Sequence, residues 1–305
     1  MEIASVKKRL DEVYENAQVI PFDSDSRLVI MSDCHRGQGN AGDNFLANQT
    51  VCFGALEYYF QNGFTYIEAG DGDELWENRR LKPIVEVHSD IFWMLSRFYK
   101  QKRLYMLYGN HDIIKRRKDY MSRHCDTYYC DSSHCDIPLL PGISVAEGMI
   151  LKNSGASEEI FLVHGHQGDL LNDTLWPLAR FLVRYVWRHL ELLGFLDPTG
   201  AGRPRKAKEH IEKKLASYAK ERQHVLIAGH THRPVFSEPE EGCYFNTGSC
   251  VHPRCITCIE IERNNIMLVK WSVRPREDRS LFVEREVLEG PVSLSKYACR
   301  KDNDN

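Results

Sequence analysis

Five short apolar runs, each ending in glycine or a polar residue, constrain the fold of this chain more than any other feature. They are RLVIMSD, FTYIEAGD, RLYMLYGN, EIFLVHG and HVLIAGH. Each has the length of a buried strand, and the first three are separated by stretches long enough for a helix. Strands that alternate with helices in this way predict an α/β fold.

The second half of the chain has a different pattern. Four segments alternate apolar and polar residues and are joined by short turns: CYFNTG, CITCIEIE, NIMLVKWSV and LFVEREVL. Such alternation is typical of antiparallel strands, so we expect the second half to supply a second sheet. A chain of 305 residues is long enough to bury a large core, and we expect a single domain, 1–305.

A helical pattern replaces the strands before the last of the five runs. The segment LWPLARFLVRYVWRHLELLGFL is rich in large apolar residues. In it, Arg180, Arg184 and Arg188 are spaced four apart along one helix face. A turn-like DPTGAGRP then leads into the basic segment RKAKEHIEKKLASYAKER. We therefore expect a helical insertion at about residues 170–222.

The ten cysteines do not by themselves predict disulfides. The segment MEIASVKKRLDEVYENAQVIPF is charged and lacks the apolar core of a signal peptide, so we expect reduced thiols and a cytoplasmic location. No run approaches the roughly 20 apolar residues that span a bilayer. The cluster HCDTYYCDSSHC, with Cys125, Cys130 and Cys135, is a candidate structural zinc site, although it lacks a C-x-x-C pair.

Metal-type side chains occur at the ends of all five apolar runs. They are Asp33 and His35, Asp71, Asn110 and His111, His164, and His230 with His232. Residues at i and i+2 of an extended segment project to the same side, and α/β folds place their sites at the carboxyl ends of strands. Each of these short motifs alone is common in turns. Five of them in this order predict a metal site, of a kind that suits Mn²⁺, Fe²⁺ or Zn²⁺.

The ordered set D-x-H, GD, GNHD, HG and GHTH resembles that of the calcineurin-like metallophosphoesterases, from about Ser32 to Arg233. The resemblance implies a four-layer αββα β-sandwich, with two divalent ions at one edge, manganese being favoured over iron and zinc. Two ions about 3.5–4 Å apart activate a water and hold the phosphoryl oxygens in line. The family's ligands fall on Asp33, His35 and His232 for one ion, and on Asn110, His164 and His230 for the other.

Further residues complete the site that this resemblance implies. Asp71 would bridge the two ions, and Asp73 in GDGDELW is the alternative bridge. His111 would stabilise or protonate the leaving oxygen, with Asp112 orienting it, as general acid catalysis requires. In HGHQGD the first histidine matches the family ligand, so we expect His166 to lie behind the ligands.

Within the superfamily, the chain most resembles the UDP-2,3-diacylglucosamine hydrolases, the pyrophosphatases of lipid A synthesis. GDGDELW resembles their GD-x-x-E-x-W, HGHQGDLLND resembles their HGD-x-x-x-x-D, and a helical insertion precedes GHTHRP. The chain departs from them in having GNHD where they have GNRD, and GSCVHPRCITCIEIE has no recognised counterpart. The resemblance implies hydrolysis of a phosphodiester or pyrophosphate in an amphipathic nucleotide sugar.

The helical insertion fits such a substrate. Its apolar residues, Phe181 and Trp187 among them, would line an acyl groove or touch the inner face of the membrane; packing as an ordinary core is the alternative. Arginines near the motifs and in the insertion would contact the anionic groups of the substrate, or else simply face solvent. These arginines are Arg79, Arg80, Arg116, Arg180 and Arg184.

Three other functions stay open at this point. The same chemistry could act on small nucleotides or cyclic nucleotides. A nuclease is disfavoured, because the net charge is -3 and the sequence lacks the aromatic and basic groove expected for nucleic acid. A metal-stabilised protein that binds a partner without catalysis is disfavoured because every ligand position is filled.

Overall fold

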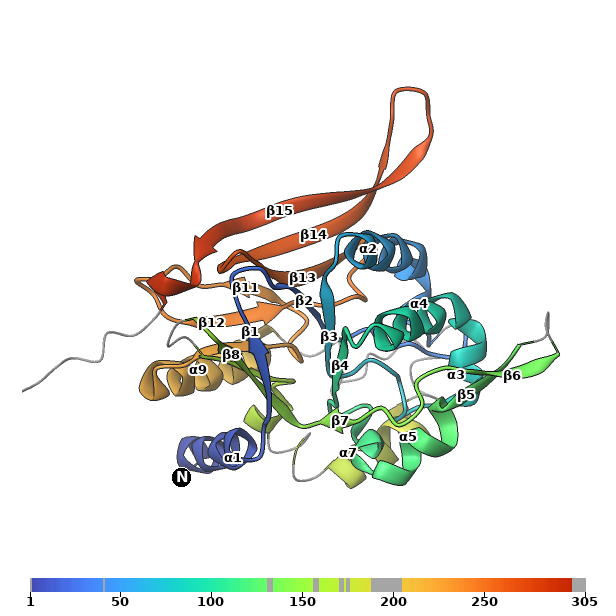
Figure 1. The fold of residues 1–305 in the computed structure, drawn as a ribbon. Coiled ribbons are helices and arrows are strands. Elements are labelled where there is room, and N and C mark those ends of the chain that lie inside the picture. Colours follow the sequence, from blue (N-terminus) through green and yellow to red (C-terminus); the bar gives the residue numbers. More distant parts are fainter. Residues whose placement is uncertain are drawn as a thin grey trace, which may run out of the picture.

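Two sheets form the centre of the fold, and helices cover them on both sides (Figure 1). The computed structural model describes residues 2–40, 42–130, 134–155, 159–169, 173, 176–187 and 205–297. The longer helices in these ranges are α1 (Glu2–Glu15), α2 (Gln49–Gln61), α3 (Lys82–Val87), α4 (Ser89–Lys100), α5 (Lys118–Cys125), α7 (Trp176–Leu182) and α9 (Arg205–Arg222). Shorter helical turns lie at Leu46–Asn48, Ile113–Arg116, His166–Gly168, Val183–Trp187 and Leu294–Lys296.

One sheet has seven strands in the described part of the chain, in the order β15-β14-β13-β2-β3-β4-β7. In that order they are Leu281–Ser293, Asn265–Pro275, Cys255–Glu262, Arg27–Met31, Thr65–Ala69, Leu104–Leu107 and Val145–Ala146. Strands β2, β3 and β4 are parallel, with α2 in the first crossover and α3 and α4 in the second. The α/β pattern predicted from the first three apolar runs is therefore confirmed.

The C-terminal strands do not form a separate sheet, so that prediction is wrong. Strands β13, β14 and β15 are antiparallel to one another, as predicted, but β13 pairs with β2, placing Ile259 opposite Ile30. Six successive residues of β13 are buried, because the strand lies inside the sheet with both faces covered. The long β14–β15 hairpin extends beyond the rest of the fold (Figure 1).

The other sheet has six strands among the described residues, in the order β1-β8-β9-β10-β12-β11. They are Gln18–Phe22, Gly148–Asn153, Glu159–Val163, Val225–Ala228, Tyr244–Thr247 and Pro234–Phe236. The predicted strand CYFNTG is β12, which runs parallel to β10 and antiparallel to β11. A separate hairpin is formed by β5 (Thr127–Cys130) and β6 (Cys135–Pro138).

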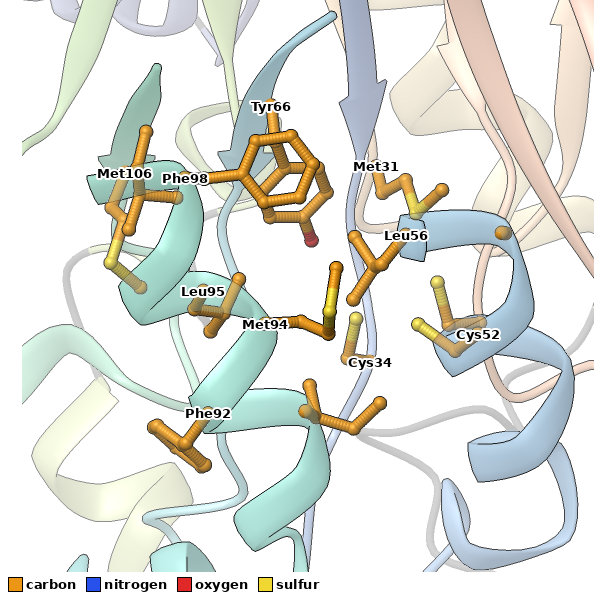
Figure 2. Packing of buried hydrophobic residues seen from close by; sticks show 14 of the residues in the cluster. Met31, Cys34, Cys52, Leu56, Tyr66, Phe92, Met94, Leu95, Phe98 and Met106 are labelled. Atoms are coloured by element: carbon orange, nitrogen blue, oxygen red, sulfur yellow. The ribbon is translucent and has the colours of Figure 1, made fainter. Parts of the chain in front are cut away.

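Three apolar cores separate four layers. Between the seven-stranded sheet and helices α2 and α4, Met31, Tyr66 and Phe98 pack together (Figure 2). Ile30 belongs to the core between the two sheets, and Leu215 of α9 belongs to the core beneath the six-stranded sheet. Because alternate residues of β2 enter different cores, the strand is apolar from Leu28 to Met31. The arrangement is the four-layer αββα sandwich expected from the sequence.

The helical insertion lies only partly within the described residues. Helices α7 and α9 and the turn Val183–Trp187 are present at the expected place, while residues 170–172, 174–175 and 188–204, including Arg188, lie outside the described ranges. In the described part, no helix is both long enough and apolar enough to cross a membrane.

A buried ionic network joins three loops of the seven-stranded sheet. Arg36 lies 2.8 Å from Glu68 and 2.7 Å from Asp73, and Lys115 lies 2.7 Å from both Asp73 and Asp112. None of the five is more than 2% exposed. Burial raises the pKa of Asp73, but Arg36 and Lys115 outweigh burial and lower this pKa below its ordinary value. The network therefore ties together the chain that follows β2, β3 and β4.

We expect Lys115→Met to lower the free energy of unfolding by about 3–5 kcal/mol, because it leaves two buried carboxylates without their shared cation. Urea unfolding followed by circular dichroism measures the change. Lys118→Met, at an exposed position of α5, is the matched control and should change stability by less than about 0.5 kcal/mol. Equal stability of the two variants would contradict the role given to the network.

Candidate metal centre

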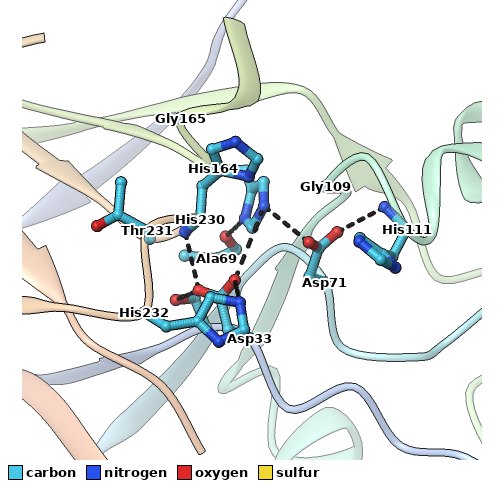
Figure 3. A network of polar contacts seen from close by, with 12 residues as sticks. Asp33, Ala69, Asp71, Gly109, His111, His164, Gly165, His230, Thr231 and His232 are labelled. Atoms are coloured by element: carbon cyan, nitrogen blue, oxygen red, sulfur yellow. Dashed lines mark hydrogen bonds and ion pairs between the residues drawn. The ribbon is translucent and has the colours of Figure 1, made fainter. Parts of the chain in front are cut away.

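The predicted ligands converge where β2, β3, β4, β9 and β10 end at their carboxyl ends. Asp33, Asp71, His164, His230 and His232 point toward one another (Figure 3). All the predicted ligands lie in chain segments just after a strand, and they are buried or nearly so: Asp33, His35, Asp71, Asn110, His164, His230 and His232. Residues that are far apart in the sequence thus form one cluster.

Two overlapping groups of ligand atoms can be distinguished within this cluster. In the first, His232 Nε2 lies 3.2 Å from Asp33 Oδ1 and 3.3 Å from His35 Nε2. In the second, His164 Nε2 lies 3.0 Å from Asp71 Oδ2, and His230 completes the group. Asp71 Oδ2 is also 3.8 Å from His35 Nε2. Asp71 therefore lies between the two groups, whereas Asp73 is part of the ionic network.

The unpaired atoms of this cluster fit divalent cations. Asn110 Oδ1 is buried and accepts no hydrogen bond from any described residue, and Asp33 Oδ1, also buried, faces histidine Nε2 atoms at 3.2–4.0 Å. Native proteins rarely leave such atoms without a partner. The Nε2 atoms of His35 and His232 face each other. Two imidazoles have this arrangement when both direct a lone pair at the same ion. Carboxylate, imidazole and amide oxygen together suit Mn²⁺, Fe²⁺ or Zn²⁺.

The backbone at the ligands is left-handed, which corrects the expectation of extended segments. The φ angles are 53° at Asp33, 48° at His35, 51° at Asp71, 68° at His230 and 56° at His232. Such angles cost a non-glycine residue about 1–3 kcal/mol and cluster at functional sites. Hydrogen bonds across loops hold them: Asp33 N donates to Gly70 O, His35 N to Asp71 O, and His230 N to Asp33 Oδ2.

Glycines beside the ligands allow the loops to approach one another closely. A Cβ atom on Gly109 would collide with the carboxylate of Asp71, whose Oδ1 accepts a hydrogen bond from His111 N at 2.8 Å. Gly70 has a φ of 90°, and a Cβ there would meet the ring of His164. The glycines of GD and GNHD are therefore required by packing around Asp71.

Glu74 is a candidate functional residue that the sequence analysis did not assign, although it is the E of GD-x-x-E-x-W. Its Oε2 lies 3.0 Å from His35 Nδ1 and 2.7 Å from His111 Nδ1. Its Oε1 accepts hydrogen bonds from the backbone of Trp76 and Glu77. Glu74 therefore orients a predicted ligand and the predicted proton donor with a single, fixed carboxylate.

The surroundings of His111 favour its charged form. Burial lowers the pKa of His111, but Glu74 and Asp71 outweigh burial and raise this pKa above its ordinary value. The ring also stacks on Trp76, with centroids 4.3 Å apart. A histidine that is protonated near neutral pH can act as a general acid.

Asp112 does not contact the ring of His111, so the prediction that it orients this residue is wrong. Its carboxylate accepts hydrogen bonds from Gly109 N at 2.7 Å and from Gly72 N at 3.2 Å, and it pairs with Lys115. Asp112 therefore fixes the backbone of the loops, while Glu74 contacts the His111 side chain.

The predicted substrate-binding arginines divide into two groups. Arg79 and Arg80 are exposed and line a hollow of about 520 Å³ together with Arg184 and Tyr185. Arg184 also donates to the backbone oxygens of Trp76 and Leu75, so it anchors the insertion to the loop after β3. Arg116 and Arg180 are outside this hollow's lining, and both lie against the ring of Trp176.

The two remaining sequence features, His166 and the cysteine cluster, lie in different parts of the structure. His166 is buried behind His164, with ring centroids 5.6 Å apart. The cysteine cluster is divided, because Cys125 is buried at the end of α5 whereas Cys135 is exposed on β6, opposite position 130 of β5. Within the described ranges, neither cysteine belongs to a group of side chains able to hold an ion.

The match to one protein family agrees with this geometry. The family model described as calcineurin-like phosphoesterase matches residues 26–234, a range that contains every predicted ligand. No curated protein matches the chain. A crystal structure of Vps29 from Chaetomium thermophilum is similar at 10% sequence identity with a TM-score of 0.39, covering 87% of this chain and 96% of that chain.

We expect Glu74→Gln to lower the rate of hydrolysis of an aryl phosphodiester by about 10–100-fold, the usual cost of losing a carboxylate that orients a ligand histidine. Mn²⁺ affinity, measured by calorimetry, should weaken as well. Glu86→Gln changes an exposed carboxylate of α3 and serves as the matched control. Wild-type rate and affinity in Glu74→Gln would show that the two histidines do not need this carboxylate.

Proposed function

The chain belongs to the calcineurin-like phosphoesterase family and is a metal-dependent phosphohydrolase, and on this premise we propose that it hydrolyses the pyrophosphate bond of an amphipathic nucleotide sugar. UDP-2,3-diacylglucosamine is the substrate that we favour. The observation that carries the proposal is the hollow lined by Arg79 and Arg80, to which the insertion contributes Arg184 and Tyr185.

The predicted ligands divide between two ions in this proposal. One ion would be held by Asp33, His35 and His232 and the other by Asn110, His164 and His230, while Asp71 would serve both. We favour Mn²⁺, with Fe²⁺ and Zn²⁺ as alternatives. When bound, such a pair of ions polarises the phosphoryl group and lowers the pKa of water.

The protein supplies the proton for the leaving oxygen. Glu74 holds Nδ1 of His111, which leaves Nε2 as the atom that donates the proton. Trp76 covers one face of the ring and excludes water there. Its own Nε1 is buried and has no acceptor among the described residues.

Different surfaces of the protein bind the charged and the apolar parts of the substrate in this proposal. Arg79 and Arg80 provide guanidinium groups for the anionic groups of the substrate, since arginine binds phosphate in a bidentate manner. Arg184, held by two backbone oxygens, forms a fixed wall of the hollow, and we assign no substrate contact to Arg116 and Arg180.

An apolar face on α7 and the turn after it suits acyl chains. Leu178 is 53% exposed, Phe181 55% and Tyr185 47%, and their spacing puts them on the same side of the helix. Side chains of this kind enter the boundary of a lipid layer. We therefore propose that the protein works in the cytoplasm, at the inner face of the membrane.

Mn²⁺-loaded protein should cleave UDP-2,3-diacylglucosamine at least about tenfold faster than UDP-glucose, because only the first has acyl chains, each of which gains about 0.8 kcal/mol per buried CH₂. Mass spectrometry should identify UMP and the acylated sugar phosphate as products. Asp71→Asn is the negative control and should abolish turnover while the circular dichroism spectrum stays unchanged. Turnover of an aryl phosphodiester or small nucleotides alone would refute the lipid substrate and keep the metal chemistry.

Arg79→Gln should raise KM for UDP-2,3-diacylglucosamine by about tenfold with little change in kcat, because a charge-assisted hydrogen bond made equally in the ground state and the transition state is lost. Steady-state kinetics measure both constants. Arg123→Gln, on the exposed side of α5, is the control and should behave as wild type. An unchanged KM in Arg79→Gln would remove the hollow from the proposal.

A further inference from the structure

A second group of metal-type side chains lies beside the candidate metal centre. It consists of Glu147, His166 and Asp173, and one ligand atom from each lies within 4.8 Å of the others. Glu147 precedes β8, His166 follows β9, and Asp173 lies in the chain that leads to α7. None of these residues is among the predicted ligands of the two ions.

His166 is the residue that points to a ligand here. It is fully buried, and neither ring nitrogen has a hydrogen-bond partner in the described part of the chain. An unsatisfied buried polar group costs about 1–3 kcal/mol, so a native imidazole in this position calls for a partner. Gln167, the next residue, has its amide hydrogen-bonded to Glu147 and to Gly165 N and does not supply one.

The distances between the three side chains suit an ion better than a hydrogen bond. His166 Nε2 lies 3.9 Å from Asp173 Oδ1, which is too long for a hydrogen bond. Two atoms that each coordinate one transition-metal ion at about 2.0–2.2 Å are separated by up to about 4 Å. An ion between His166 and Asp173 would give the imidazole its missing partner.

The local charge also favours a cation. Glu147 and Asp173 bring two carboxylates to this group. Arg9 of α1 contacts Glu147 and lies 3.2 Å from Asp173 Oδ2. Arg9 Nη2 also donates a long hydrogen bond of 3.5 Å to Asp173 Oδ1, and its single positive charge balances one of the two negative charges. A bound cation would balance the remaining negative charge.

We propose that Glu147, His166 and Asp173 form a third divalent-cation site, separate from the two-ion centre. The mixture of imidazole and carboxylate selects Mn²⁺, Fe²⁺ or Zn²⁺ rather than Mg²⁺ or Ca²⁺. The ion has a structural role: it joins the chain entering the insertion, at Asp173, to the end of β9, at His166. It thereby holds the insertion next to the two-ion centre.

The number of ions bound to the full chain tests this site without any measurement of turnover, so the result does not depend on the proposed substrate. Protein stripped with a chelator is saturated with Mn²⁺, desalted, and its manganese counted by elemental mass spectrometry. We expect three ions per chain in the wild type and two in both His166→Asn and Asp173→Asn. His210→Asn, at an exposed position of α9, is the control and should keep three.

Crystals soaked in Mn²⁺ give an independent measurement, because anomalous scattering should place a third peak between His166 and Asp173. Two ions in the wild type, or three in both variants, would overturn the proposal. A count below two in both variants would also overturn it, since His166 and Asp173 would then serve the two-ion centre itself.

Discussion

The candidate metal centre depends on the buried ionic network behind it. Arg36 directly follows His35, Asp73 lies two residues after Asp71, and Asp112 lies two residues after Asn110. Predicted ligands and network residues therefore alternate along the same three loops, so one set faces the ions and the other faces the network. The left-handed backbone at the ligands is unfavourable by itself, and the paired charges of the network hold these loops in place.

The positions of two histidines in the centre depend on Glu74. One carboxylate oxygen contacts both His35, a predicted ligand, and His111, the predicted proton donor. The position of the donor is therefore coupled to the position of the ligand, which general acid catalysis needs because proton transfer requires hydrogen-bond distances. Trp76 adds a rigid surface to this arrangement and connects it to Arg184 of the insertion through its backbone oxygen.

The sequence predicts much of this structure because its signals are local. Strand β10 and the histidines after it are visible in HVLIAGHTH, since a strand and its end are encoded by neighbouring residues. Pairing is not local: nothing within CITCIEIE indicates that β13 lies beside β2. The orienting role of Glu74 rather than Asp112 is likewise decided in three dimensions, because both carboxylates lie close to His111 and only their contacts distinguish them.

The pairing of β13 with β2 also determines when the centre can be completed during synthesis. Strand β2 carries Asp33 and His35 at its end and is made early, while its neighbour β13 and the ligands His230 and His232 are made late. Until then, one edge of β2 has no partner and offers an aggregation-prone surface to other chains. The nascent chain therefore cannot complete the two-ion centre before the segment that carries His230, His232 and β13 has been synthesised.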